Sequence, residues 1–355
     1  MEYLLLVLGC AFLVGMILSA FLHVCFFQFD SLQDSFLSSI FAIAISAVIG
    51  IVVISLCFWN EDDFITYFSY TQYLAPLCCV LLLLPALLVF DGLLLVSSVL
   101  IVSFVGVYLS DIVITFNEDF PLWLNMFFTS VLWSLFSLSF YCLSGLNIFP
   151  QSQGMIPSLG FVVLTILGGA PLIMGASAAV LVGVLFVACL RCKIQPMAHL
   201  GTIVLGYIIG WIGLVSYPEK LFSCFAIFVM YCLLESGLSV FRKCTTLPQY
   251  ADIPYNSTLY NVFKEGGSSE LILKVIYTVG LCLILLGILQ INSSRESSLP
   301  LFALMFCAWQ QYRTINWQVP DKSFKEINGE TVKSLKEFFG LLANKSNKKN
   351  HTDDK

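Results

Sequence analysis

Residues 71–109 read TQYLAPLCCVLLLLPALLVFDGLLLVSSVLIVSFVGVYL, an apolar run that only Asp91-Gly92 interrupts. A helix needs about 20 apolar residues to cross the hydrocarbon core of a bilayer, so this run is long enough for two crossings. The Asp-Gly pair supplies a polar turn between them. The stretch therefore predicts two consecutive membrane-spanning helices, over 72–90 and 93–110.

The same alternation of long apolar runs and short polar stretches continues along the chain. Residues 156–190 divide near the Gly-Gly-Ala-Pro sequence at 168–171, which leaves two shorter runs. The predicted spans are 3–27, 37–58, 72–90, 93–110, 122–144, 156–171, 173–190, 199–215, 221–240, 271–291 and 299–312. We therefore expect an all-α integral membrane protein with about eleven transmembrane helices.

The composition supports this class and excludes others. Hydrophobic residues make up 59% of the chain and charged residues 11%, against about 45–50% and about 25% in soluble domains. These values exclude a soluble enzyme and a disordered chain, and the net charge of −5 argues against a nucleic-acid-binding protein. Most of the 13 cysteines lie inside apolar runs, where they act as small hydrophobes.

Lys and Arg residues are distributed unevenly between the two sides of the predicted spans. Fifteen of the 17 follow odd-numbered spans or lie in the C-terminal tail, and only Lys220 and Arg295 fall on the other side. Because cytoplasmic loops carry the excess of Lys and Arg, the N-terminus is predicted outside and the C-terminus in the cytoplasm. No Lys or Arg precedes the first apolar run, so that run is expected to be retained as a span.

The chain divides into a polytopic transmembrane domain, 1–312, and a polar cytoplasmic tail, 313–355. Apolar residues in the tail recur at helical spacing, and they are Val332, Leu335, Phe338, Phe339 and Leu342. This pattern predicts a short amphipathic helix near 330–343, which either lies on the inner leaflet or packs on the protein.

The predicted cytoplasmic side carries short motifs in a fixed order. They are Asp91-Gly92, NIFPQSQGM at 147–155, MAHLGTIVLG at 197–206, LLESGLSVFRK at 233–243 and NSTLY at 256–260. The segment at 147–155 resembles the NxxDGxDGL loop of the polyprenyl-phosphate N-acetylhexosamine-1-phosphate transferases, the MraY and WecA types. The later three resemble the family's MGDxGSxxLG, LLDTxxxxxRR and RSHLYQR segments, and Asp91-Gly92 stands where the family has an Asp-Asp pair.

The resemblance covers about residues 28–265 and implies a function in cell-envelope glycan synthesis. Family members lie in the bacterial inner membrane, where they move a sugar-1-phosphate from a UDP-sugar onto a polyprenyl phosphate and release UMP. The implied partners are therefore membrane lipid, polyprenyl phosphate and a UDP-sugar. The implied cofactor is Mg²⁺, a hard cation that the family binds with aspartates of the inner loops.

This chain departs from the family where the family carries charge. The two aspartate positions of the NxxDGxDGL loop read Pro150 and Gln153, and the histidine loop has no histidine. His199 stands at the aspartate of the MGD motif, and Glu235 stands at the aspartate of the LLD motif. Loss of one preorganised electrostatic group costs roughly 10²–10³ in rate. The sequence therefore predicts a catalytically impaired relative with weak or absent Mg²⁺ binding.

The remaining polar residues on these loops are the candidate site. Asp91, His199 and Glu235 are candidate catalytic residues, and no residue is assigned as a metal ligand. The candidate substrate-binding residues are Asn147, Gln153, Arg242 and Lys243. Glu235 lies in an apolar span, where ionisable side chains are costly and often functional, and Arg242 or Lys243 is its expected partner.

Each of these residues also has a purely structural interpretation. Asp91 can end a helix in water, His199 can begin a span at the interface, and the cations can act as topology signals. For the whole chain, three functions stay open. It can be a non-catalytic relative that binds the lipid carrier or partners an active enzyme, an active transferase with a rebuilt site, or an unrelated transporter-like protein.

Overall fold

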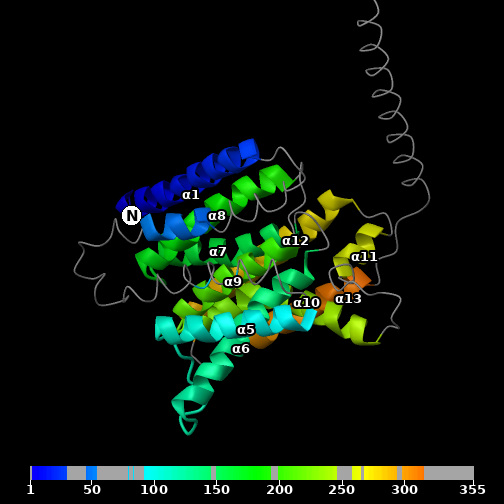
Figure 1. The fold of residues 1–355 in the computed structure, drawn as a ribbon. Helices are drawn as coiled ribbons and strands as arrows, with labels where there is room; N and C mark the ends of the chain where they lie inside the picture. Colours follow the sequence, from blue (N-terminus) through cyan, green and yellow to red (C-terminus); the bar gives the residue numbers. More distant parts are fainter. Residues whose placement is uncertain are drawn as a thin grey trace, which may run out of the picture.

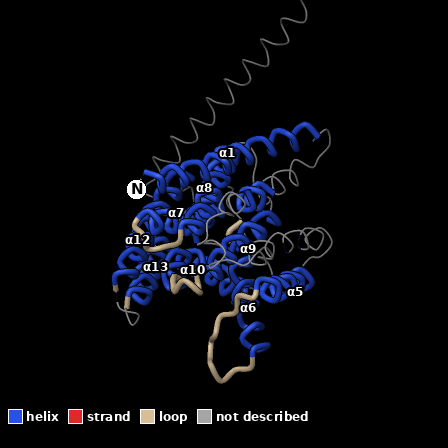
Figure 2. The backbone as a smooth tube through the Cα atoms, turned by 90° about the vertical axis from the view of Figure 1, so that its left-hand side faces the viewer, coloured by secondary structure: helices blue, strands red, loops and turns tan. Residues whose placement is uncertain are grey.

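A computed structural model describes most of the transmembrane domain. The described residues are 2–29, 45–53, 79, 83, 92–144, 149–192, 199–245, 258–264, 268–293 and 298–315. Within these ranges all regular secondary structure is helical and no strand occurs (Figure 2). The predicted all-α fold is confirmed for this part of the chain.

Ten labelled helices form one bundle (Figure 1). They are α1 (Glu2–Phe29), α5 (Gly92–Ser110), α6 (Leu122–Cys142), α7 (Phe149–Ile166), α8 (Leu172–Cys192), α9 (His199–Val215), α10 (Phe222–Thr245), α11 (Thr258–Lys264), α12 (Ser269–Asn292) and α13 (Leu299–Ile315). Residues 45–53 are also helical. The predicted amphipathic helix near 330–343 lies outside the described residues.

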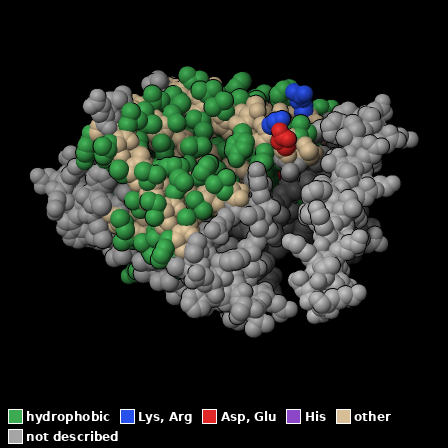
Figure 3. All heavy atoms as spheres, turned by 90° about the horizontal axis from the view of Figure 1, so that it is seen from above, with side chains coloured by type: hydrophobic (Ala, Val, Ile, Leu, Met, Phe, Trp, Pro, Cys, Tyr) green, Lys and Arg blue, Asp and Glu red, His purple; other side chains and the backbone are tan. Residues whose placement is uncertain are grey.

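Five of the described helices are long and apolar enough to cross a membrane. The qualifying segments are Tyr3–Leu22, Leu122–Cys142, Leu172–Leu190, Phe222–Arg242 and Glu270–Ile291. Two shorter apolar helices, Leu94–Ser110 and Gly201–Val215, accompany them. The outer face carries the matching apolar surface, with charged side chains gathered near one edge (Figure 3). The molecule therefore has the helices and the apolar surface of a membrane protein.

Helix α7 departs most from the predicted spans. It begins at Phe149, seven residues before the expected start at 156, and it ends at Ile166 rather than at 171. Gly168 has a φ of +75°, and the amide of Gly169 donates to the Leu164 carbonyl at 2.8 Å, which closes the helix early. Part of the segment predicted as an inner loop is therefore the first two turns, approximately, of a buried helix.

The described connections α5–α6, α7–α8 and α9–α10 lie at one end of the bundle, which we call the turn end. There the Thr115 amide donates to the Tyr217 hydroxyl at 3.1 Å, which joins the α5–α6 and α9–α10 connections. The Cys224 thiol donates to the Gly287 carbonyl at 3.5 Å, so α10 begins where α12 approaches its end. The helix ends opposite form the second end, which we call the polar end, and α11 lies there (Figure 1).

The centre of the bundle is a tight contact between α6 and α9. Trp133 and Tyr207 stack with ring centroids 4.3 Å apart, and both side chains are fully buried. The Trp133 indole also donates to the Tyr207 carbonyl at 2.8 Å. A Cβ atom on Gly210 would stand 2.7 Å from the Trp133 ring, so glycine is what lets the two helices approach.

Helices α1 and α8 also meet through glycines. A side chain on Gly15 would collide with the Val180 carbonyl, and one on Gly183 would collide with the Phe12 carbonyl. In lipid, where apolar surface alone drives no helix association, such close backbone approach is a main source of attraction. This crossing attaches the first helix to the rest of the bundle.

Candidate functional site

A polar stripe runs along one face of α10 toward the polar end. Tyr231, Glu235, Ser239 and Arg242 follow each other at spacings of four, four and three residues, which aligns them on one side of a helix. Tyr231, Glu235 and Ser239 are each completely buried. An ionisable side chain buried in a membrane helix is expensive, so Glu235 must be held by compensating contacts.

Glu235 is held by two other helices. Its Oε1 accepts a hydrogen bond from the backbone amide of Leu259, in the first turn of α11, at 3.1 Å. Its Oε2 accepts one from the side-chain amide of Gln311 on α13. Arg242, half-buried on the same stripe, adds a favourable charge interaction with the carboxylate. One carboxylate thus joins α10, α11 and α13.

Several other polar atoms around this carboxylate are buried without a partner. Within the described part of the chain, no hydrogen bond reaches the Tyr231 hydroxyl, the Ser239 hydroxyl, the Thr258 hydroxyl or the Gln311 carbonyl oxygen. Buried polar atoms in native proteins are nearly always paired, and each exception calls for an explanation. The polar end therefore holds unused hydrogen-bonding capacity next to Glu235.

Gln153 of α7 faces the same region. Gly160 of α7 lies against the Phe228 ring of α10, since a Cβ on Gly160 would stand 2.6 Å from it. One heptad, about two turns of helix, separates Gly160 from Gln153 and also Phe228 from Glu235, toward the polar end in each case. Gln153 is 2% exposed, and its amide nitrogen has no hydrogen-bond partner among the described residues.

The other predicted site residues are only partly described. Asp91 and Asn147 lie outside the described residues, as do the side chains of His199 and Lys243. His199 is the first residue of α9, and α9 begins at the polar end. The structure thus brings Gln153, Glu235 and Arg242 to one end of the bundle.

The described cluster does not fit the Mg²⁺ ion that the family resemblance implies. A hard divalent cation prefers several carboxylate or carbonyl oxygens in octahedral arrangement. Glu235 supplies the carboxylate of this cluster, and protein donors engage both of its oxygens. Among the described residues, no three His, Cys, Asp or Glu side chains lie close enough together to bind a metal ion.

Sequence reasoning missed most of the polar residues that surround Glu235. Tyr231 and Ser239 lie four residues to either side of it, and that spacing on an apolar helix is a usable signal. Gln311 could not be recognised in this way. It is adjacent to Gln310 near the end of a short span, where polar residues are equally typical of the membrane interface. Thr258 lies in a segment that was expected to be a loop.

Comparisons with known proteins add no relative. No protein-family model matches the chain, and no curated protein matches it. The class that the helices define is an all-helical membrane protein.

Proposed function

We propose that the chain is a non-catalytic relative of the polyprenyl-phosphate N-acetylhexosamine-1-phosphate transferases that binds a polyprenyl phosphate in the bacterial inner membrane. The order of the family-like motifs motivates this proposal. Their described parts begin α7, begin α9, end α10 and form α11, and all of these lie at the polar end. In an enzyme of this kind the motif loops must meet around one substrate.

The single observation that supports a non-catalytic function is the way in which Glu235 is buried and hydrogen-bonded. Among the candidate catalytic residues that the structure describes, Glu235 carries a carboxylate. Its side chain is completely buried. Both oxygens accept hydrogen bonds from other helices, so its role is to hold α10, α11 and α13 together. A carboxylate that binds a metal or activates a phosphate needs its oxygens directed at the ligand.

The proposal includes the finer topology. It has eleven spans, an outer N-terminus and a cytoplasmic C-terminus, with the polar end facing the cytoplasm. The observation in favour is that Lys274, Arg242 and Arg313 all belong to helix segments at the polar end. Lys220 lies in the α9–α10 connection at the turn end, in agreement with the excess of cations on the cytoplasmic side.

The test uses the purified full-length chain in detergent with undecaprenyl phosphate, a panel of UDP-N-acetylhexosamines and Mg²⁺ or Mn²⁺. UMP release is measured beside an active family enzyme, and undecaprenyl phosphate binding is measured on the same sample by native mass spectrometry. We expect binding without UMP release. Release that Glu235→Gln abolishes would instead establish an active transferase with a rebuilt site.

A second outcome would also contradict the proposal. If a folded, monodisperse sample neither releases UMP nor binds undecaprenyl phosphate more tightly than a neutral polyprenol, the family relationship fails. The transporter-like alternative would then be preferred. The matched variant is Gln153→Met, which should weaken undecaprenyl phosphate binding without unfolding the protein, because the Gln153 amide nitrogen is an unused donor at the polar end.

A further inference from the structure

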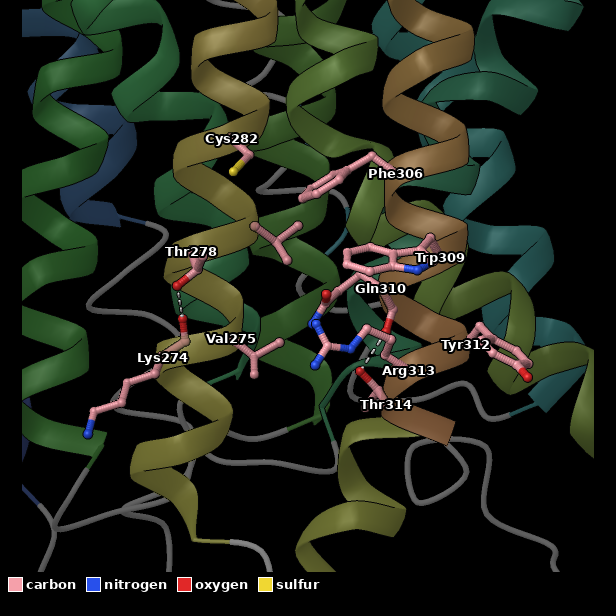
Figure 4. A pocket seen from close by; sticks show the side chains of 11 residues that line it. Lys274, Val275, Thr278, Cys282, Phe306, Trp309, Gln310, Tyr312, Arg313 and Thr314 are labelled. Carbon is pink, nitrogen blue, oxygen red and sulfur yellow. Dashed lines mark hydrogen bonds between the residues drawn. The ribbon is translucent and has the colours of Figure 1, made fainter. Parts of the chain in front are cut away.

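A groove of about 900 Å³ lies between α12 and α13, outside the part of the chain that resembles the transferases. Both helices pack against α10 but touch each other only sparsely, which leaves the space between them open. Figure 4 shows Phe306, Trp309, Gln310 and Arg313 of α13 lining one wall, opposite Val275 of α12. Its volume lies within the range of ordinary ligand sites, roughly 300–1,000 Å³.

The groove changes chemistry along its length. Toward the middle of the helices its walls are apolar, with Val279, Cys282 and Phe306. Toward the polar end it carries the amide of Gln310 and the guanidinium of Arg313, whereas the Lys274 side chain at its edge extends away from α13 (Figure 4). This arrangement matches a ligand with an anionic head and a hydrocarbon chain.

The two cations differ in how firmly they are held. The Arg313 guanidinium lies 5.2 Å from the centre of the Trp309 ring, which orients it at the mouth of the groove. Lys274 forms an exposed ion pair with Glu270 at 3.0 Å, and such a pair contributes little and exchanges readily. Arg313 is therefore the contact for an anion in the groove, whereas Lys274 is paired outside it.

The surroundings identify the side from which a ligand enters. Leu281 and Leu285 on α12 and Met305 on α13 are exposed, so the outer surface beside the groove is apolar. An amphipathic residue such as Trp309, which is 53% exposed here, is typical of the level of the lipid headgroups. A lipid can therefore enter sideways from the bilayer with its head at Arg313.

We propose that the α12–α13 groove binds an anionic glycerophospholipid, with its phosphate at Arg313 and an acyl chain along Val279, Cys282 and Phe306. This site is independent of the proposed polyprenyl phosphate function, because it uses neither Glu235 nor Gln153. Basic residues near a membrane surface attract anionic lipid by about 1 kcal/mol each. Arg313→Gln should accordingly weaken binding about five-fold.

The test measures binding of phosphatidylglycerol and phosphatidylcholine to the delipidated full-length chain by native mass spectrometry. We expect phosphatidylglycerol to bind more tightly, and we expect Arg313→Gln to reduce that preference about five-fold. Lys220→Gln is the matched control, because it removes an equal charge from the turn end. Equal affinities for the two lipids, or equal effects of the two variants, would overturn the proposal.

A second pair of variants tests the groove by shape. Thr278→Trp fills the groove, whereas Leu281→Trp adds the same ring to the neighbouring exposed face of α12. We expect the first to lower phosphatidylglycerol binding at least ten-fold and the second to leave it unchanged. Equal binding by these two folded variants would contradict a groove site even if Arg313→Gln failed to fold.

Two competition experiments distinguish a lipid phosphate from free phosphate, and a glycerophospholipid from a polyprenyl phosphate. Inorganic phosphate should not compete at millimolar concentration, because it lacks the chain that fills the apolar part. An equal concentration of undecaprenyl phosphate should not displace phosphatidylglycerol from the wild-type protein or from Leu281→Trp, whose groove stays open. Competition by phosphate, selective displacement by undecaprenyl phosphate, or a dimer that Thr278→Trp dissociates would each overturn the assignment to a glycerophospholipid.

Discussion

The two ends of the bundle differ in how their buried side-chain amides are paired. At the turn end, Asn125 accepts from the Phe116 amide at 3.2 Å, and Thr129 accepts from the Ile114 amide at 3.0 Å. At the polar end, Gln153 and Gln311 each keep a buried polar atom with no partner among the described residues. Glu235, in contrast, is held there by other helices on both oxygens.

This difference indicates that one end of the fold stabilises the bundle and that the other end has a functional role. A turn whose polar groups are satisfied by side chains needs nothing further and only connects two helices. Polar atoms left unpaired in a low-dielectric interior lower stability, so they persist where they serve something else. The polar end is therefore where a ligand is expected, and the turn end is where the bundle is secured.

Glu235→Ala should have the largest effect on stability. It leaves the Leu259 amide and the Gln311 side chain buried without their acceptor, so the free energy of unfolding should fall by about 3 kcal/mol. Reversible unfolding in mixed micelles measures this. Glu235→Gln is the control, since its amide oxygen can still accept one bond and should cost less. Equal losses in the two variants would mean that the contacts are not what stabilises the three helices.

Thr129→Val tests the turn end at a smaller scale. Valine keeps the shape but removes the acceptor for the Ile114 amide, which should lower the free energy of unfolding by about 1–2 kcal/mol. Ser130→Ala is the matched control on the same helix, because that hydroxyl bonds only to the Met126 carbonyl one turn away. The turn end is not a stabilising region if both variants unfold at the same denaturant concentration.

Gln153→Met should act in the opposite direction. It replaces an unpaired buried amide with an apolar chain of similar length, so the free energy of unfolding should rise by about 1 kcal/mol. Thr165→Val lies on the same helix, where the hydroxyl is bonded to the Phe161 carbonyl at 2.9 Å, and it should bring no gain. Differential scanning fluorimetry in detergent compares the two, and a loss of stability in Gln153→Met would show that this amide is paired after all.

Glu219→Gln should have the smallest effect. Partial burial raises the pKa of the Glu219 carboxyl above its ordinary value, so the folded state disfavours the charged form. Stability from this group is therefore full below the ordinary pKa and declines as pH rises through the raised value. At pH 7 the variant should be more stable by less than about 0.5 kcal/mol, and the difference should vanish in acid. Unfolding at pH 4 and pH 7 checks the sign, and a variant that is less stable at pH 7 contradicts it.

The sequence predicted helices where apolar length alone determines them. The predicted span 199–215 coincides with α9, and 271–291 lies within α12. The start of α7 was missed, because Pro150 and three polar residues after it are typical of a loop, whereas tertiary packing buries them in a helix. Glu235 was singled out as an ionisable residue in an apolar span, and the structure shows it completely buried, whereas its functional role stays a prediction. Its partner Gln311 could not be found, since their contact depends on how α10 and α13 pack.

The glycine contact between α1 and α8 has a consequence for how the protein is made. Gly15 and Gly183 are 168 residues apart, so the first helix leaves the ribosome long before its partner exists. At about 5–20 residues per second this delay is on the order of ten to thirty seconds. During biogenesis the small-residue face of α1 must be covered by lipid or by the insertion machinery until α8 arrives to replace that cover.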